Sequence, residues 1–191
     1  MTLQKLTDVS PIVGYGSPIL RKTCEEVDDN ELSRMEWSAL AVTLDSLNSC
    51  VGLAAPQINI QARMFIMRPI KNLHTITVIN PVITKRRGKQ HYEEGCMSIP
   101  KTFGMVEGRD DIIDVEFYDE FFNKQKRRFR GFESIIFQHE YDHLNGILFI
   151  DHLTKAGREE ISEKLNEIER GQADTTYHMF WPETDIKHTK D

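Results

Sequence analysis

The sequence predicts an α+β fold in which mostly antiparallel strands surround a central metal-binding helix, with further helices near the N-terminal and C-terminal ends. Short runs rich in β-branched and aromatic residues fill the middle of the chain, and apolar residues recur at helical spacing on both sides of them. A His-Glu-x-x-His pattern at 139–143 falls inside the second helical segment. With 191 residues, the chain is long enough to bury one core. We expect a single catalytic domain over 1–171 and a tail of unassigned role over 172–191.

The first helix is predicted over 31–48. Asp28, Asp29 or Asn30 can cap its N-terminus, because their side chains accept hydrogen bonds from the free amides of a first turn. Its apolar positions follow the 3.6-residue period at Leu32, Met35, Ala39, Leu40, Thr43, Leu44 and Leu47.

The central part of the chain is predicted to form strands, mostly antiparallel, over 64–68, 75–83, 112–118 and 126–130. Residues 119–124 join the last two, which predicts a hairpin. Two more helices are predicted over 131–145, ending at Asn145-Gly146, and over 156–170, ending at Gly171. The aromatic residues of the tail pack against the body of the protein or contact a partner.

Composition excludes several classes of protein. A formal net charge of -6 argues against a nucleic-acid binder, and we expect no sequence-specific nucleic-acid partner. No apolar run approaches the roughly 20 residues of a membrane helix, so no membrane association is expected. Three cysteines are too few for a disulfide framework, and the first residues lack the pattern of a signal peptide. These features predict a cytoplasmic location.

The pattern at 139–143 indicates a hydrolytic metal site. Residues i and i+4 share one face of a helix, so His139 and His143 can reach one divalent metal while Glu140 lies beside the water bound there. A helix with two surface histidines would show the same letters.

A catalytic site needs a third protein ligand and one position open for water. Phe149 occupies the place where metzincin proteases have a third histidine. A zinc endopeptidase could instead use a later glutamate, namely Glu159, Glu160 or Glu163. Cys96 is the remaining candidate, because a thiolate binds Zn²⁺ or Fe²⁺ strongly and Gly95 lets the backbone approach closely. Taken alone, Cys96 could equally be a buried, inert thiol.

Three segments together resemble the three motifs of peptide deformylases: Cys50-Val51-Gly52-Leu53-Ala54-Ala55-Pro56-Gln57, Glu94-Gly95-Cys96-Met97-Ser98 and Gln138-His139-Glu140-Tyr141-Asp142-His143. The resemblance extends through Tyr15 to Arg21 and Leu144 to Phe149, and it covers about residues 10–155.

This resemblance implies hydrolysis of the formyl group from the N-terminal formyl-methionine of newly made polypeptides. It assigns the metal to Cys96, His139 and His143, and the role of general base and acid to Glu140. The metal would be Fe²⁺ in the cell, with Zn²⁺, Ni²⁺ or Co²⁺ possible in purified protein. Transient association with the ribosome would follow from the nascent-chain substrate.

The same resemblance assigns stabilisation of the oxyanion to the Gln57 side-chain amide and the backbone N–H of Met97. It implies that the backbone of Val51 and Gly52 pairs with the extended substrate. Val51, Ile135 and Ile136 could line a pocket for the methionine side chain, although they suit a hydrophobic core equally well.

The chain departs from the family pattern at three positions. Cys50 stands where the family usually has glycine, Lys101 stands where it often has glycine, and Met97 replaces the usual leucine, a milder change because this position contributes its backbone N–H. A cysteine at a position with positive φ would cost about 1 kcal/mol. A binding module that keeps the fold but has lost turnover through Cys50 is therefore a third hypothesis. Asp142 either orients a metal ligand or simply solvates its helix.

Overall fold

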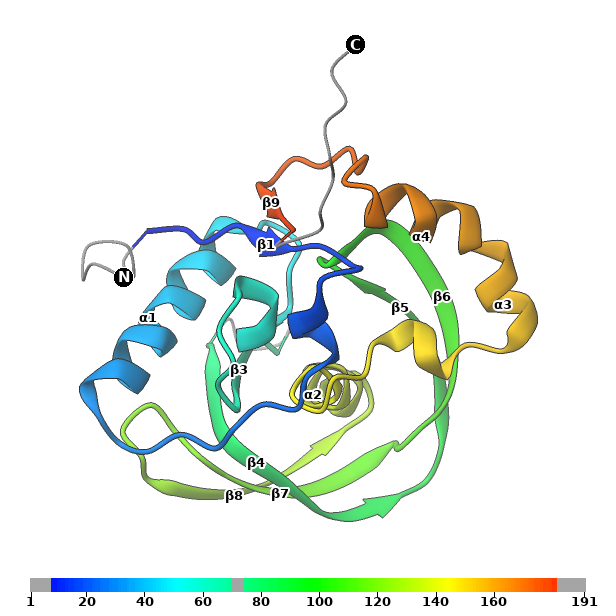
Figure 1. Ribbon diagram of the computed structural model, residues 1–191. Coiled ribbons are helices and arrows are strands. Elements are labelled where there is room, and N and C mark those ends of the chain that lie inside the picture. Colours follow the sequence, from blue (N-terminus) through cyan, green and yellow to red (C-terminus); the bar gives the residue numbers. More distant parts are fainter. Residues whose placement is uncertain (1–7, 70–73, 182–191) are drawn as a thin grey trace.

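Helix α2 lies at the centre of the molecule, with strands curving around it and the other helices outside (Figure 1). The structure is a computed structural model, which describes residues 8–69 and 74–181. The predicted fold class is confirmed. Its helices are α1 (Glu31–Ser46), α2 (Phe132–His143), α3 (Lys155–Glu160) and α4 (Ser162–Glu169), with 3-10 turns η2 (Pro18–Arg21), η3 (Ala55–Ile58) and η4 (Phe149–His152). Its strands are β1 (Ile12–Val13), β2 (Gly52–Ala54), β3 (Met64–Met67), β4 (Ile76–Arg87), β5 (Gln90–Cys96), β6 (Ile99–Arg109), β7 (Ile112–Tyr118), β8 (Lys124–Arg130) and β9 (Met179–Phe180).

A five-stranded antiparallel sheet of order β2-β3-β4-β7-β8 supports α2. The predicted hairpin is present as β7 and β8, which pair from Ile112 with Arg130 to Tyr118 with Lys124. Aromatic rings join the sheet to the helix, since the Phe137 ring lies 5.1 Å from Phe65 and 5.3 Å from Phe129. This packing fixes α2 against the sheet.

Helix α1 matches the first predicted helix. Asn30 caps it by accepting a hydrogen bond from the Ser33 N–H at 3.0 Å. Its buried face includes Ala39, Leu40 and Leu44, whereas Leu32 is exposed.

Strands β5 and β6 were not predicted from the sequence. They form an antiparallel pair whose connecting turn is Met97-Ser98. Their sequences contain Pro100, Gly95 and Gly104 and several charged residues, so no apolar or β-branched run marks them. Pairing with each other, rather than local propensity, makes them strands.

The third predicted helix was wrong as a single element. It divides at Ile161, which is the C-cap of α3 and the N-cap of α4 with φ -96° and ψ 0°. Helix α3 buries none of its residues, whereas α4 buries Leu165 and Ile168 in the core. The break lets the second half turn its apolar side inward.

Residues 172–181 of the tail pack against the body, and β9 pairs in parallel with β1.

Elsewhere, the buried carboxylate of Asp110 accepts hydrogen bonds from Lys89 at 2.8 Å and from Arg86 at 2.7 Å. Among the helices of the described residues, none is long and apolar enough to cross a membrane.

Candidate active site

The structure brings the three predicted metal ligands together. The ligand atoms of Cys96, His139 and His143 all lie within 4.8 Å of one another. Cys96 comes from the end of β5, while both histidines project from one face of α2, one turn apart. Two separate elements therefore meet at one point with a sulfur and two imidazole nitrogens.

The ligands of the endopeptidase alternative do not join this cluster. Glu159, Glu160 and Glu163 are exposed on α3 and α4. Phe149 is buried, and its ring centroid lies 6.4 Å from that of His139.

A buried network of charges holds His139 in place. The Glu94 carboxylate lies 2.8 Å from Nδ1 of His139 and accepts two hydrogen bonds from Arg109, at 2.7 and 3.0 Å. Arg109 also donates to Asp142 at 2.6 Å, and His152 lies 2.7 Å from the same carboxylate. A carboxylate on one ring nitrogen leaves the other nitrogen free to bind a metal.

This network was largely missed from the sequence. Glu94 stands inside the second motif, but its role was not assigned, and no pattern marks Arg109 as buried. Asp142 belongs to the network rather than to the solvated face of its helix, because it anchors Arg109 behind the metal ligands.

The donor set fits a divalent cation. Within this site, two buried side-chain atoms have no hydrogen-bond partner among the described residues, Oε2 of Glu140 and Nδ1 of His143. Burial, with a contribution from His139, lowers the pKa of His143 well below its usual value, so the ring is neutral as metal binding requires. One thiolate and two imidazoles form a three-ligand set that leaves a tetrahedral position open.

The buried carboxyl of Glu140, the predicted general base, has a raised pKa. Burial raises its pKa to about 7, although His139 opposes the shift. A group with a pKa near neutrality can both accept and donate a proton. Gly52 makes room for it, since a Cβ at that position would lie 2.4 Å from Oε1 of Glu140.

The Gln57 side chain points its amide nitrogen into the site. Its Oε1 accepts a hydrogen bond from the Ala54 N–H at 2.9 Å, which fixes the orientation of the amide. Its Nε2 lies 3.3 Å from Sγ of Cys96 and 3.4 Å from Oγ of Ser98. Gln57 is therefore held by backbone on one side and offers a donor next to Cys96, a predicted metal ligand, on the other.

A cavity of about 690 Å³ is bordered by four of these residues, Gln57, Cys96, His139 and Glu140. The four residues predicted to contact substrate, Val51, Gly52, Ile135 and Ile136, all line it. Ile136 also packs in the hydrophobic core, so it borders the cavity and the core at once, and its contact with substrate stays a prediction.

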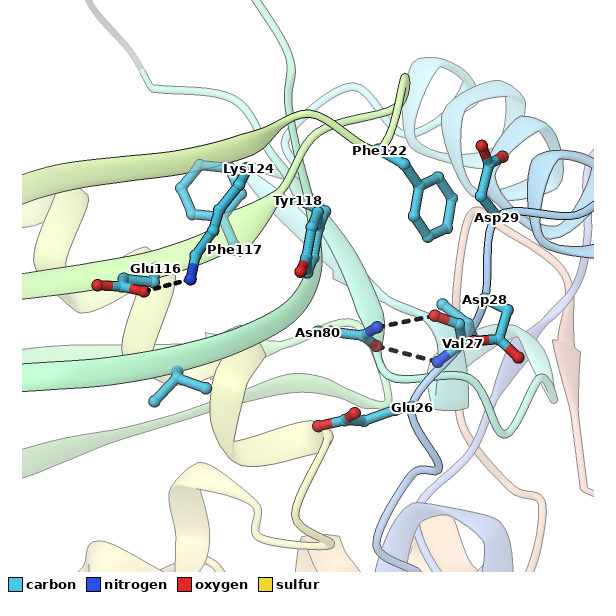
Figure 2. Close-up of a pocket in the computed structure, with 11 residues that line it drawn as sticks. Glu26, Val27, Asp28, Asp29, Asn80, Glu116, Phe117, Tyr118, Phe122 and Lys124 are labelled. Carbon is cyan, nitrogen blue, oxygen red and sulfur yellow. Dashed lines mark hydrogen bonds and ion pairs between the residues drawn. The ribbon is translucent and has the colours of Figure 1, made fainter.

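A second hollow of about 500 Å³ lies between the segment before α1 and strands β4 and β7 (Figure 2). Asn80 binds the backbone of Val27 through both its amide atoms, and Glu116 pairs with Lys124 at 2.8 Å. Its lining contains no histidine or cysteine. Of the two, the first cavity is the one lined by cysteine and histidine.

Comparison with known proteins shows the family of the chain. The family model for polypeptide deformylase matches residues 9–159. The chain belongs to the polypeptide deformylase family. This family consists of metal-dependent enzymes that remove the N-terminal formyl group.

Relatives and solved structures cover most of the chain. The peptide deformylase of Flavobacterium psychrophilum is 37% identical over 188 residues, which cover 90% of this chain and 96% of the relative. A Plasmodium falciparum peptide deformylase in complex with an inhibitor superposes with a TM-score of 0.75 at 36% identity, covering 83% of this chain and 99% of that one. A deformylase from Acinetobacter baumannii with Met-Ala-Ser bound has a TM-score of 0.70 at 29% identity, covering 77% and 99%.

The two departures at glycine positions have different consequences for the backbone. Cys50 is not among the non-glycine residues with positive φ in the described chain, so the expected strain is absent there. Its buried thiol lies 2.9 Å from the Gly52 carbonyl, and burial raises its pKa to about 12, so the neutral thiol donates. Lys101 does adopt positive φ, at 53°, and its Nζ pairs with Asp174 at 2.6 Å.

Proposed function

We propose that this deformylase hydrolyses N-terminal formyl-methionine with one divalent metal held by Cys96, His139 and His143. The observation that supports the proposal is the convergence of these three ligand atoms within 4.8 Å, next to the buried carboxylate of Glu140. A bound metal would supply Lewis-acid chemistry and activate a water for attack on the formyl carbon.

The protein groups around the metal site perform the proton transfers and stabilise charge. Glu140 accepts the proton of the attacking water and then donates it to the leaving amine, which its pKa of about 7 permits. The Gln57 amide and the Met97 backbone N–H donate hydrogen bonds to the oxygen that becomes negative as the formyl carbon turns tetrahedral. Removing one such donor typically costs about 10²- to 10³-fold in kcat.

The substrate peptide extends along β2. This strand lies at one edge of the five-stranded sheet, so the backbone of Val51 and Gly52 can pair with an added strand. Ile135 and Ile136 border the same cavity and offer an apolar surface to the methionine side chain. The Met-Ala-Ser peptide bound by the Acinetobacter baumannii protein is the product that such a reaction leaves behind.

Formate release from formyl-Met-Ala-Ser by anaerobically purified protein, with metal analysis of the same sample, tests the proposal. We expect one metal per chain, and we expect Cys96→Ala to lose both metal and formate release. Cys24→Ala is the matched control, because Cys24 is a buried thiol outside the cavity, and it should keep both. Full metal retention by Cys96→Ala would refute the ligand assignment.

The competing hypotheses have their own outcomes in this assay. Internal cleavage of an unformylated peptide would indicate an endopeptidase. No formate from the metal-loaded native chain, with recovery in Cys50→Gly, would indicate a binding module. We further propose Fe²⁺ as the metal in the cell, with Zn²⁺, Ni²⁺ or Co²⁺ able to occupy the site in purified protein. Cytoplasmic location and transient contact with the ribosome stay predictions.

A further inference from the structure

The C-terminal segment forms one wall of the active-site cavity. Asp174, Thr175, Thr176 and Tyr177 line it together with Met97 and Lys101. These four residues lie beyond residue 159, where the match to the deformylase family model ends. The wall is therefore built from a part of the chain to which the family pattern assigns no role.

The C-terminal segment is hydrogen-bonded to the turn that joins β5 to β6. The hydroxyl of Tyr177 donates a hydrogen bond to the Met97 carbonyl at 2.8 Å. On the next peptide of the same turn, the Ser98 carbonyl accepts a hydrogen bond from the Tyr15 N–H at 2.8 Å. Both carbonyls of this two-residue turn are thus held from outside the hairpin.

The two segments that donate these hydrogen bonds, which contain Tyr15 and Tyr177, also contact each other. Trp181 donates from Nε1 to the Tyr15 carbonyl at 3.2 Å. Gly14 leaves the space that the indole fills, since a Cβ there would lie 2.2 Å from Nε1 of Trp181. The parallel pairing of β9 with β1 joins the same two segments, residues 12–15 and residues 177–181, through their backbones.

We propose that Tyr177 is a positioning residue that orients the Met97 backbone N–H toward the reacting carbonyl. The inference rests on the proposed function, which makes that N–H an oxyanion donor. Met97 lies between the ligand Cys96 and the anchored carbonyl, so restraining the turn restrains the direction of its N–H. Burial raises the pKa of Tyr177, so its hydroxyl keeps the proton that it donates.

Such a role predicts a specific kinetic change in Tyr177→Phe, which removes only the hydroxyl. The net free energy of one ordinary hydrogen bond corresponds to about a 2- to 10-fold change in rate. We expect this loss in kcat, because the Met97 N–H that Tyr177 orients acts on the transition state. KM for formyl-Met-Ala-Ser should change less than about 2-fold, since the restraint is not a substrate contact. Metal content should not change.

Tyr118→Phe is the matched control, because Tyr118 lines the second hollow and not the active-site cavity (Figure 2). It should keep native kcat. An unchanged kcat in Tyr177→Phe, or a loss that follows loss of metal, would overturn the inference while leaving the proposed function intact. Absence of formate release from the native chain would instead count against the proposed function.

Amide hydrogen exchange provides a test that does not depend on turnover. We expect faster exchange at Met97 and Ile99 in Tyr177→Phe than in the native chain or in Tyr118→Phe. Gly14→Ala, which displaces Trp181 without touching the cavity, should raise exchange at the same amides. Native exchange rates at this turn in both Tyr177→Phe and Gly14→Ala would overturn the inference.

Discussion

Gly52→Ala places a methyl group against the carboxylate of Glu140, and we expect it to remove most of the hydrolytic activity. The added Cβ would lie 2.4 Å from Oε1 and 2.8 Å from Cγ and Cδ of Glu140, whereas ordinary contact begins at 3.4 Å. The carboxylate must therefore move by about 1 Å, away from its position beside the predicted metal ligands. A misplacement of about 1 Å at a reacting group costs on the order of 10²-fold in rate.

The assay is kcat/KM for formate release, measured on samples of equal metal content. Overpacking should also lower the free energy of unfolding by about 1 to 3 kcal/mol, which urea denaturation measures. Gly157→Ala is the control, because its Cβ would make only ordinary contacts, the nearest at 3.5 Å from Thr154. Gly52→Ala with native kcat/KM and full metal content would refute the role given to Glu140.

Three further predictions concern the surroundings of the site. Glu94→Gln weakens the carboxylate support of a metal-binding histidine, so metal affinity should fall about 10- to 100-fold in a chelator competition, while exposed Glu107→Gln leaves it unchanged. Burial alone would raise the pKa of Asp110, but its partners Lys89 and Arg86 outweigh burial and hold the pKa below its usual range. Ionised Asp110 therefore stabilises the fold above about pH 4, and this stabilisation is lost as the pH falls through the pKa of the folded state. The difference in urea midpoint between the native chain and Asp110→Asn should therefore narrow in acid, and a constant difference would contradict the reasoning. Lys101 adopts a left-handed backbone conformation that costs a non-glycine residue about 1 kcal/mol, and its side chain forms an exposed ion pair with Asp174. Lys101→Gly and Lys101→Ala both lose the ion pair, but only the glycine variant relieves the backbone strain. The alanine variant should be the less stable of the two in urea.

Local patterns predicted the elements whose signals are complete within one segment. The first helix and the strand over 112–118 were predicted from periodicity and composition, and the structure contains both. Strands β5 and β6 could not be predicted in this way, because their pairing joins residues that carry no apolar run. The break at Ile161 likewise depends on where the core lies relative to the helix.

The site shows the same division. His139, Glu140 and His143 share one helix, so their spacing alone predicted that they would face one point. Cys96 was a candidate ligand from its own chemistry, and the family resemblance supported it and added Gln57. The structure places Cys96 beside the histidines and Gln57 beside Cys96.

The sequence by itself determined the chemistry of this protein, because a helix places residues i and i+4 together whatever surrounds it. Tertiary structure decided what supports that chemistry. Arg109 reaches Asp142 across 33 positions, and Tyr177 reaches Met97 across 80. Contacts of this kind depend on how distant segments pack, and no local pattern of residues records them.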